Sequence, residues 1–186
     1  MSMKNISWYW NLLHFYLFIW FKHAHSIFNQ LNPITYFFKI PIVKNFYAKR
    51  GISDMNKFAD EVVFNDREKG IIIIWAGVQI GGIFIFIEYA IFNIVQGCIG
   101  KSLINQIWEN KVYASLFVIM LLSAAGLFNY FVVFRNDMYL KYFNEFEKLP
   151  KKSKRNYGWL SFLAIILILV FLVFSFVLVP SGARLP

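Results

Sequence analysis

Few side chains in this sequence have a type and a spacing that could do chemistry, and the most informative is a carboxyl group within an apolar run. Glu88 lies about two-thirds of the way along the segment IIIIWAGVQIGGIFIFIEYAIFNIV, residues 71–95. An acidic side chain at the centre of a membrane-spanning helix costs about 2.5–3.5 kcal/mol on insertion scales, and protonation lowers that cost. Glu88 is therefore expected to be either a proton or cation site or a hydrogen-bonded packing residue.

The residues that share a helix face with Glu88 indicate contact with another helix. Gly77, Gly81, Phe84 and Glu88 fall on one face, and Gly77-x-x-x-Gly81 permits the close approach of two backbones. By depth, Ser123 of an antiparallel second span is the expected hydrogen-bond partner of Glu88. The sequence therefore predicts that this face packs against protein.

Two amides predict a second contact on the opposite face. Gln79 matches Asn129 in depth when both are counted from the short loop between the first two spans. A Gln79–Asn129 pair would contribute about 0.6–2 kcal/mol. Ser123-Ala-Ala-Gly126 supplies the small residues that such a crossing needs. One face of the first span would then serve the hairpin, and the other a partner subunit.

The motifs for catalysis and for metal binding are incomplete. Gly97-Cys-Ile-Gly-Lys-Ser resembles the end of a phosphate-binding loop, but Val95 occupies the position of the first glycine. His23 and His25 are two residues apart, so they do not share a helix face. All three histidines lie in the amino-terminal segment, so none is close to Cys98 in sequence to act as its base. We expect no enzyme activity, no cofactor and no metal.

The composition indicates an all-α integral membrane protein. Hydrophobic residues make up 59% of the 186 residues and charged residues 16%, against about 45–50% and about 25% in soluble domains. A soluble domain of this size has too little interior for so much apolar surface. The same composition excludes a disordered chain, and a single cysteine excludes a disulfide scaffold.

Three segments are long and apolar enough to cross the roughly 30 Å hydrocarbon core as helices. These spans are 71–95, 112–134 and 159–179, within a transmembrane domain of residues 71–180. A capping box of Asn65 and Glu68 is expected to begin the first helix. A cytoplasmic loop, 135–158, joins the second and third spans, and a short tail, 181–186, follows.

The basic residues predict the orientation of the spans. Sixteen of the nineteen Lys and Arg side chains lie before the first span or in the second loop, and three lie in the first loop and the tail. The positive-inside rule then places the amino terminus in the cytoplasm and the carboxyl terminus outside. The net charge of +9 is thus mainly a topology signal, and no nucleic-acid partner is expected. A bias towards Lys, Asn, Ile and Phe is typical of an AT-rich genome, so the membrane is expected to be a bacterial inner (plasma) membrane.

The first seventy residues are predicted to form an aromatic and basic region on the cytoplasmic surface. Residues 6–21, ISWYWNLLHFYLFIWF, place Asn11 and His14 on a polar stripe among aromatic rings. This pattern is typical of an amphipathic helix lying in the membrane interface. A short fourth span is the alternative. Ser53 is expected to cap a short helix over residues 55–64.

These patterns leave several functions open. The first is a non-enzymatic subunit, accessory protein or scaffold of a membrane complex, which would use the Gly77–Glu88 face. The second is an oligomeric pore or ion-coupled channel subunit with Glu88 facing the lumen. The third is an immunity-type or regulatory protein of the inner membrane. The expected partners are the lipid bilayer and either other membrane protein subunits or further copies of this chain.

Overall fold

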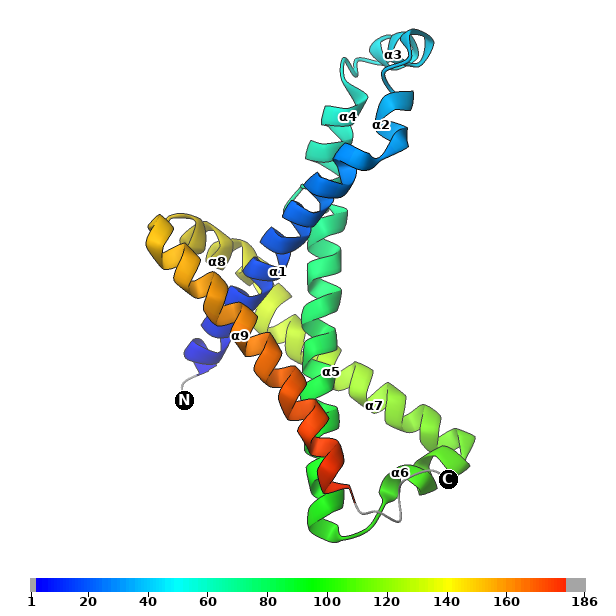
Figure 1. Cartoon of the computed structure of the whole chain (residues 1–186), viewed down its shortest axis with the longest axis vertical. Coiled ribbons are helices and arrows are strands. Elements are labelled where there is room, and N and C mark those ends of the chain that lie inside the picture. The colour runs from blue at the N-terminus through cyan, green and yellow to red at the C-terminus, as the bar shows by residue number, and fades with distance from the viewer. Residues whose placement is uncertain (1–2, 180–186) are drawn as a thin grey trace. The chain divides into compact units, whose positions relative to one another are not determined.

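Every regular element in the described part of the chain is a helix. The structure is a computed structural model that describes residues 3–179, and the predicted tail 181–186 lies outside that range. Three helical segments are long and apolar enough to cross a membrane, namely Ile71–Ile99, Lys111–Glu147 and Lys151–Leu178 (Figure 1). The prediction of an all-helical chain with three such segments is confirmed.

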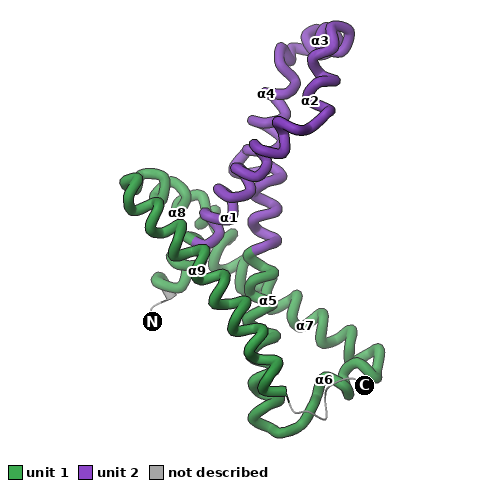
Figure 2. The backbone as a smooth tube through the Cα atoms, viewed as in Figure 1, with its two compact units in different colours: residues 1–12, 80–186 green, residues 13–79 purple. Residues whose placement is uncertain are grey.

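The chain divides into two compact units, and both boundaries fall within long helices. Unit 1 comprises residues 1–12 and 80–186, and unit 2 comprises residues 13–79 (Figure 2). Helix α1 (Met3–Leu31) and helix α5 (Ile71–Ile99) each belong partly to both units. The predicted division at residue 70, between a cytoplasmic region and a transmembrane domain, stays a prediction.

Unit 2 contains the short helices of the amino-terminal region. These are α2 (Pro33–Phe37), α3 (Pro41–Ala48), α4 (Met55–Phe58) and the π-helical segment η1 (Ala59–Phe64). The Asp60 carboxylate in η1 lies 3.0 Å from His25 Nε2 in α1 and accepts a hydrogen bond of 3.0 Å from Asn29. Asn56 donates to the Thr35 carbonyl at 3.1 Å, which ties α4 to α2. Side-chain hydrogen bonds thus tie η1 to α1 and α4 to α2.

A neighbouring aspartate, not Ser53, caps α4. One Asp54 carboxylate oxygen accepts from the backbone N–H groups of Asn56 and Lys57 at 3.0 and 3.1 Å. The prediction of a Ser53 cap is wrong because the aspartate is one residue nearer to the helix. Both side chains favour the N-cap position, and sequence alone did not separate them.

The predicted capping box before α5 is also replaced by another arrangement. Asp66 accepts backbone hydrogen bonds of 2.7 Å from both Glu68 and Lys69. These hydrogen bonds lower the pKa of the Asp66 carboxyl below its usual value, and the one from Lys69 has the larger effect. A side chain at Gly70 would collide with the Asp66 carbonyl, so this turn requires glycine at the position before α5.

Unit 1 contains the remaining long helices. They are the rest of α5, then α6 (Leu103–Glu109), α7 (Lys111–Asn129), α8 (Met138–Glu147) and α9 (Lys151–Ser175). The π-helical segment η2 (Tyr130–Phe134) continues α7, and η4 (Phe176–Leu178) continues α9. Phe92 in α5 and Phe117 in α7 pack with ring centroids 4.8 Å apart, and Tyr89 lies 5.8 Å from Phe176. Aromatic contacts thus join all three apolar segments.

The predicted loop 135–158 is mostly helical. A short 3-10 turn, η3 (Arg135–Asp137), separates η2 from α8, and it contains Asn136 and Asp137 with φ of 56° and 52°. These left-handed residues interrupt the segment Lys111–Glu147, so its apolar part ends with η2 at Phe134 and the chain changes direction before α8. Residues 138–147 of this predicted loop form α8. The basic run after Pro150 forms the first turns of α9, whereas we expected a loop there.

The amino-terminal helix does not show the expected two-sided pattern. Helix α1 is longer than predicted, and each of the consecutive residues 11–18 is buried. Two turns of the helix are therefore covered by protein on every side, whereas an interfacial helix would leave one face to lipid and another to water. Helix α1 is not among the helices long and apolar enough to span a membrane.

The left-handed turn before α8 gives a first prediction. Replacing Asn136 by valine should lower the free energy of unfolding by about 1–2 kcal/mol, because a β-branched residue tolerates positive φ poorly. The matched control is Asn144→Val, at an exposed position in regular helix where the two residues have similar helix propensity. Unfolding in detergent micelles, followed by circular dichroism, measures both changes. Equal stability of the two variants would contradict this assignment of the turn.

Candidate functional site

Glu88 is half-buried in α5, and one of its oxygens lacks a partner. Among the described residues, no hydrogen-bond partner reaches its buried Oε2 atom. The expected partner, Ser123, is exposed on α7. Ser123 therefore does not donate the predicted hydrogen bond to Glu88 Oε2. To reach that buried atom, the exposed Ser123 side chain would have to turn inwards.

The small residues of the predicted contact face have different surroundings. A methyl group added at Gly81 would lie 3.7 Å from Asn129 Nδ2, so α5 and α7 approach each other there. A methyl group at Gly126 would meet nothing within 4 Å, and Gly77 is half-buried in unit 2. Of these three glycines, Gly81 is therefore the one that the structure places in a helix contact within unit 1.

A close approach of two helix backbones involves Gly97, which the sequence indicated only as part of an incomplete phosphate-binding motif. A Cβ atom at Gly97 would lie 2.7 Å from the Leu178 carbonyl oxygen in η4. This distance is shorter than real Cβ atoms show, so the end of α5 packs on the third apolar segment in a way that only glycine permits.

Asn129 is buried and bonded on both sides of its amide. Its Oδ1 atom accepts a 2.9 Å hydrogen bond from Trp10 Nε1, and its Nδ2 atom donates to the Ala125 carbonyl at 2.8 Å. Gln79, its predicted partner, is exposed and belongs to unit 2. The Gln79–Asn129 pair stays a prediction, while α1 supplies the partner that sequence analysis had missed.

The Trp10 ring fixes where α1 meets the first two apolar segments. Its centroid lies 6.0 Å from that of Phe84 in α5 and 5.4 Å from that of Phe128 in α7, both at nearly perpendicular angles. Phe84 and Phe128 stack on each other at 4.3 Å. One indole group thus joins three helices through its ring faces and its N–H group.

The end of the second apolar segment receives two further hydrogen bonds from α1. The last carbonyl groups of a helix have no partner within the helix, and Val132 lies in the last turn of η2. Its carbonyl accepts hydrogen bonds from Asn11 Nδ2 at 2.9 Å and from Ser7 Oγ at 3.1 Å. The polar stripe predicted on α1 therefore serves a neighbouring helix end.

A second polar cluster joins the other ends of the apolar segments. Asn93 Nδ2 donates to Ser175 Oγ at 2.9 Å, and Gln96 Nε2 donates to Asn93 Oδ1 at 3.3 Å. The side-chain oxygen of Gln96, Oε1, accepts hydrogen bonds from the backbone N–H groups of Leu103 and Ile104 at 2.8 and 2.9 Å. Asn93, Gln96 and Ser175 are almost fully buried. Their side chains form a continuous series of hydrogen bonds from α9 through α5 to the start of α6.

The histidines have surroundings that do not resemble a metal site. His14 is fully buried, and this burial lowers its pKa to about 4, so the ring is neutral at pH 7. His25 stacks on Phe64 at 4.2 Å beside the Asp60 carboxylate. Within residues 3–179, no group of three His, Cys, Asp or Glu side chains is placed to hold a metal ion.

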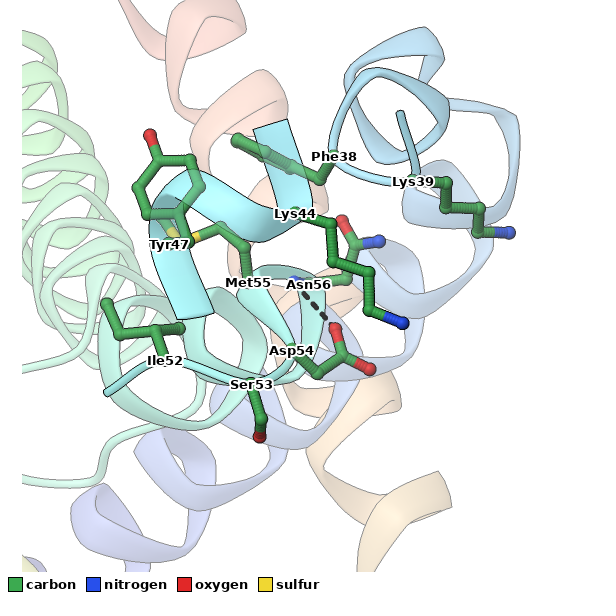
Figure 3. A pocket seen from close by; sticks show the side chains of 9 residues that line it. All are labelled: Phe38, Lys39, Lys44, Tyr47, Ile52, Ser53, Asp54, Met55 and Asn56. Carbon is green, nitrogen blue, oxygen red and sulfur yellow. Dashed lines mark hydrogen bonds between the residues drawn. The ribbon is translucent and has the colours of Figure 1, made fainter. Parts of the chain in front are cut away.

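Unit 2 contains a small polar pocket of about 180 Å³ between α3 and α4 (Figure 3). Phe38 and Tyr47 pack edge to face at 5.8 Å on one side, and Asp54 is turned back onto Asn56 on the other. Lys44 also lines the pocket. Its aspartate already accepts two backbone hydrogen bonds, so the pocket is explained by the turn that precedes α4.

Most of the residues that make these contacts were not predicted from the sequence. Asn93 and Gln96 are three residues apart in the first apolar segment, which places them on one helix face. Amides with that spacing, together with Ser175 in the third segment, were an available signal. Trp10 was expected at the level of the lipid headgroups, and its pairing with Asn129 had no signal in the sequence.

No family model, curated protein or solved structure matches this chain.

The second polar cluster gives a prediction about stability. Replacing Ser175 by alanine should lower the free energy of unfolding by about 0.6–2 kcal/mol, because the buried Asn93 amide loses its acceptor. The matched control is Ser123→Ala, at an exposed site, where a change near zero is expected. A double-mutant cycle with Asn93→Ala should show non-additive effects in detergent unfolding. Additive effects would show that the two side chains do not interact.

Proposed function

We propose that this protein is a non-enzymatic subunit or accessory protein of a membrane complex, which it joins through helix–helix contacts. The proposed location is a bacterial inner membrane, with the amino terminus in the cytoplasm and the carboxyl terminus outside. The charge distribution favours this orientation, since sixteen basic residues lie on one side of the spans and three on the other.

The polar side chains of the apolar segments support a packing role. Asn93, Gln96 and Ser175 bond to one another, and Asn129 bonds to Trp10. Groups that could bind a substrate or a proton are thus already used to hold helices together. Polar residues with such partners stabilise helix contacts in membranes.

The observation on which the proposal depends is the buried Oε2 atom of Glu88. Within the described chain this oxygen has no hydrogen-bond donor, although burial of an unsatisfied polar group costs about 1–3 kcal/mol and more for a charged one. Since the Glu88 side chain is only half-buried, it could turn towards a donor on another subunit, which would remove that cost. The neighbouring Ile91 and Val95 are exposed on the same helix, so α5 also has apolar surface to offer a partner.

An oligomeric pore is the second candidate, because the same carboxyl group could face a lumen shared by several copies. A conducting oligomer should pass cations when the full-length protein is reconstituted in liposomes. Glu88→Gln should then reduce the flux strongly, since it removes the charge and keeps the shape. Flux that is unchanged by Glu88→Gln would exclude this function.

The proposed function is tested by the mass of the complex in native membranes. The tagged full-length protein, extracted in mild detergent, should migrate with a mass above that of the 22.0 kDa chain. Glu88→Leu should weaken this assembly about 5- to 150-fold, the equivalent of about 1–3 kcal/mol, whereas Glu88→Gln should retain most of it.

The matched control is Ile91→Leu, which changes an exposed apolar residue one turn further along α5. Its complex should keep the mass of the wild type. An assembly that survives Glu88→Leu unchanged, or a wild-type protein that is monomeric at all concentrations, would contradict the proposal.

A further inference from the structure

An apolar groove lies between the start of α1, the end of the second apolar segment and the start of α8, all within unit 1. Its volume is about 490 Å³, within the range of about 300–1,000 Å³ that is usual for small-molecule sites. The apolar and aromatic side chains that line it are Ile6, Phe128, Phe131, Val132, Met138 and Tyr142.

The polar atoms within the groove are already engaged. Ser7 lines it, and its hydroxyl donates to the Val132 carbonyl at 3.1 Å and lies 3.1 Å from Met138 Sδ. The Val132 carbonyl also accepts the Asn11 amide. An occupant therefore gains little from polar contacts along the groove and gains mostly from apolar contact.

Positive charge lies at the edge of the groove. Lys4 lines it and is exposed, and the guanidinium group of Arg135 packs 5.6 Å from the ring centroid of Phe131. Lys141, beside Tyr142 in α8, is also exposed. Asp137 lies between Arg135 and Lys141, and Glu145, one turn beyond Tyr142, accepts a hydrogen bond of 3.3 Å from Trp8. The three basic side chains thus exceed these two acidic ones by one charge. An occupant with an apolar body and an anionic head would match both properties.

We propose that this groove binds one acyl chain of an anionic phospholipid, with the phosphate of its headgroup beside Lys4 and Arg135. The proposal rests on the membrane location proposed above and not on the role of Glu88. The groove adjoins Arg135, which ends the second apolar segment on the side predicted to be cytoplasmic. Acyl chains and anionic headgroups meet at that level of a bilayer.

The test measures lipid binding to the full-length protein in detergent micelles by native mass spectrometry. Phosphatidylglycerol and phosphatidylcholine with identical acyl chains are the probes. The protein should retain one phosphatidylglycerol molecule in preference to phosphatidylcholine. Lys4→Gln should weaken phosphatidylglycerol binding about fivefold, the equivalent of about 1 kcal/mol for each basic residue near an anionic surface.

Ile6→Trp should abolish the retention of either lipid, because the larger side chain occupies the groove. The matched controls are Lys151→Gln and Ile27→Trp, which change an exposed lysine and an exposed isoleucine away from the groove and should leave binding intact. Circular dichroism confirms that each variant is folded. If Ile6→Trp destabilises the chain, the exposed Phe131→Ala offers a second variant that should weaken binding.

Three results would overturn the lipid site. They are equal affinity for the two lipids, binding that neither Ile6→Trp nor Phe131→Ala alters, and a lipid-free dimer that Ile6→Trp dissociates. The last result would make the groove an interface between copies of the chain. Failure of the Glu88 experiment would leave these outcomes unaffected, so the two proposals fail separately.

Discussion

The carbonyl group of Val132 must find a hydrogen-bond donor from outside its own helix. It lies in the last turn of a π-helical segment, just before two residues with positive φ end the second apolar segment. A carbonyl group that is shielded from water and has no donor costs about 1–3 kcal/mol, so such a group has to be satisfied by protein. Asn11 and Ser7 of α1 supply both donors. The first turns of α1 are therefore part of unit 1 and not a separate surface element.

The other contacts of α1 follow from this anchor. Once Ser7 and Asn11 are fixed on Val132, the intervening residues bring Trp10 to Asn129 and to the Phe84–Phe128 stack. Trp8 packs edge to face on Phe146 in α8 and on Tyr157 in α9. The same turns form one wall of the apolar groove. Glu88 differs from this pattern, because it has a buried oxygen for which the described chain provides no donor.

The coarse fold could be predicted from the sequence, whereas most of the site could not. Length and hydrophobicity located the three apolar helices, because crossing a bilayer fixes both quantities. Contacts between helices depend on rotation and crossing angle, which a single sequence leaves open. Ser123 was thus placed on a buried face and is exposed. Gln79 was predicted to pair with Asn129 because the two lie at the same depth. In the structure the Asn129 amide accepts a hydrogen bond from Trp10, more than a hundred residues away in the sequence. The aromatic composition of α1 likewise gave no indication that its residues 11–18 are buried on all sides.

The most direct test of the account is a short chemical cross-link between α1 and α8. Ser7 Oγ and Met138 Sδ lie 3.1 Å apart, so thiols of cysteines at these two positions should be close enough for a short bismaleimide to join them. The protein would carry Cys98→Ser to remove its native thiol, and a change in mobility on a denaturing gel would report the cross-link. The account predicts efficient cross-linking of Ser7→Cys with Met138→Cys and little of Tyr9→Cys with Met138→Cys, since Tyr9 is exposed. Absence of the first cross-link, or equal formation of both, would contradict it.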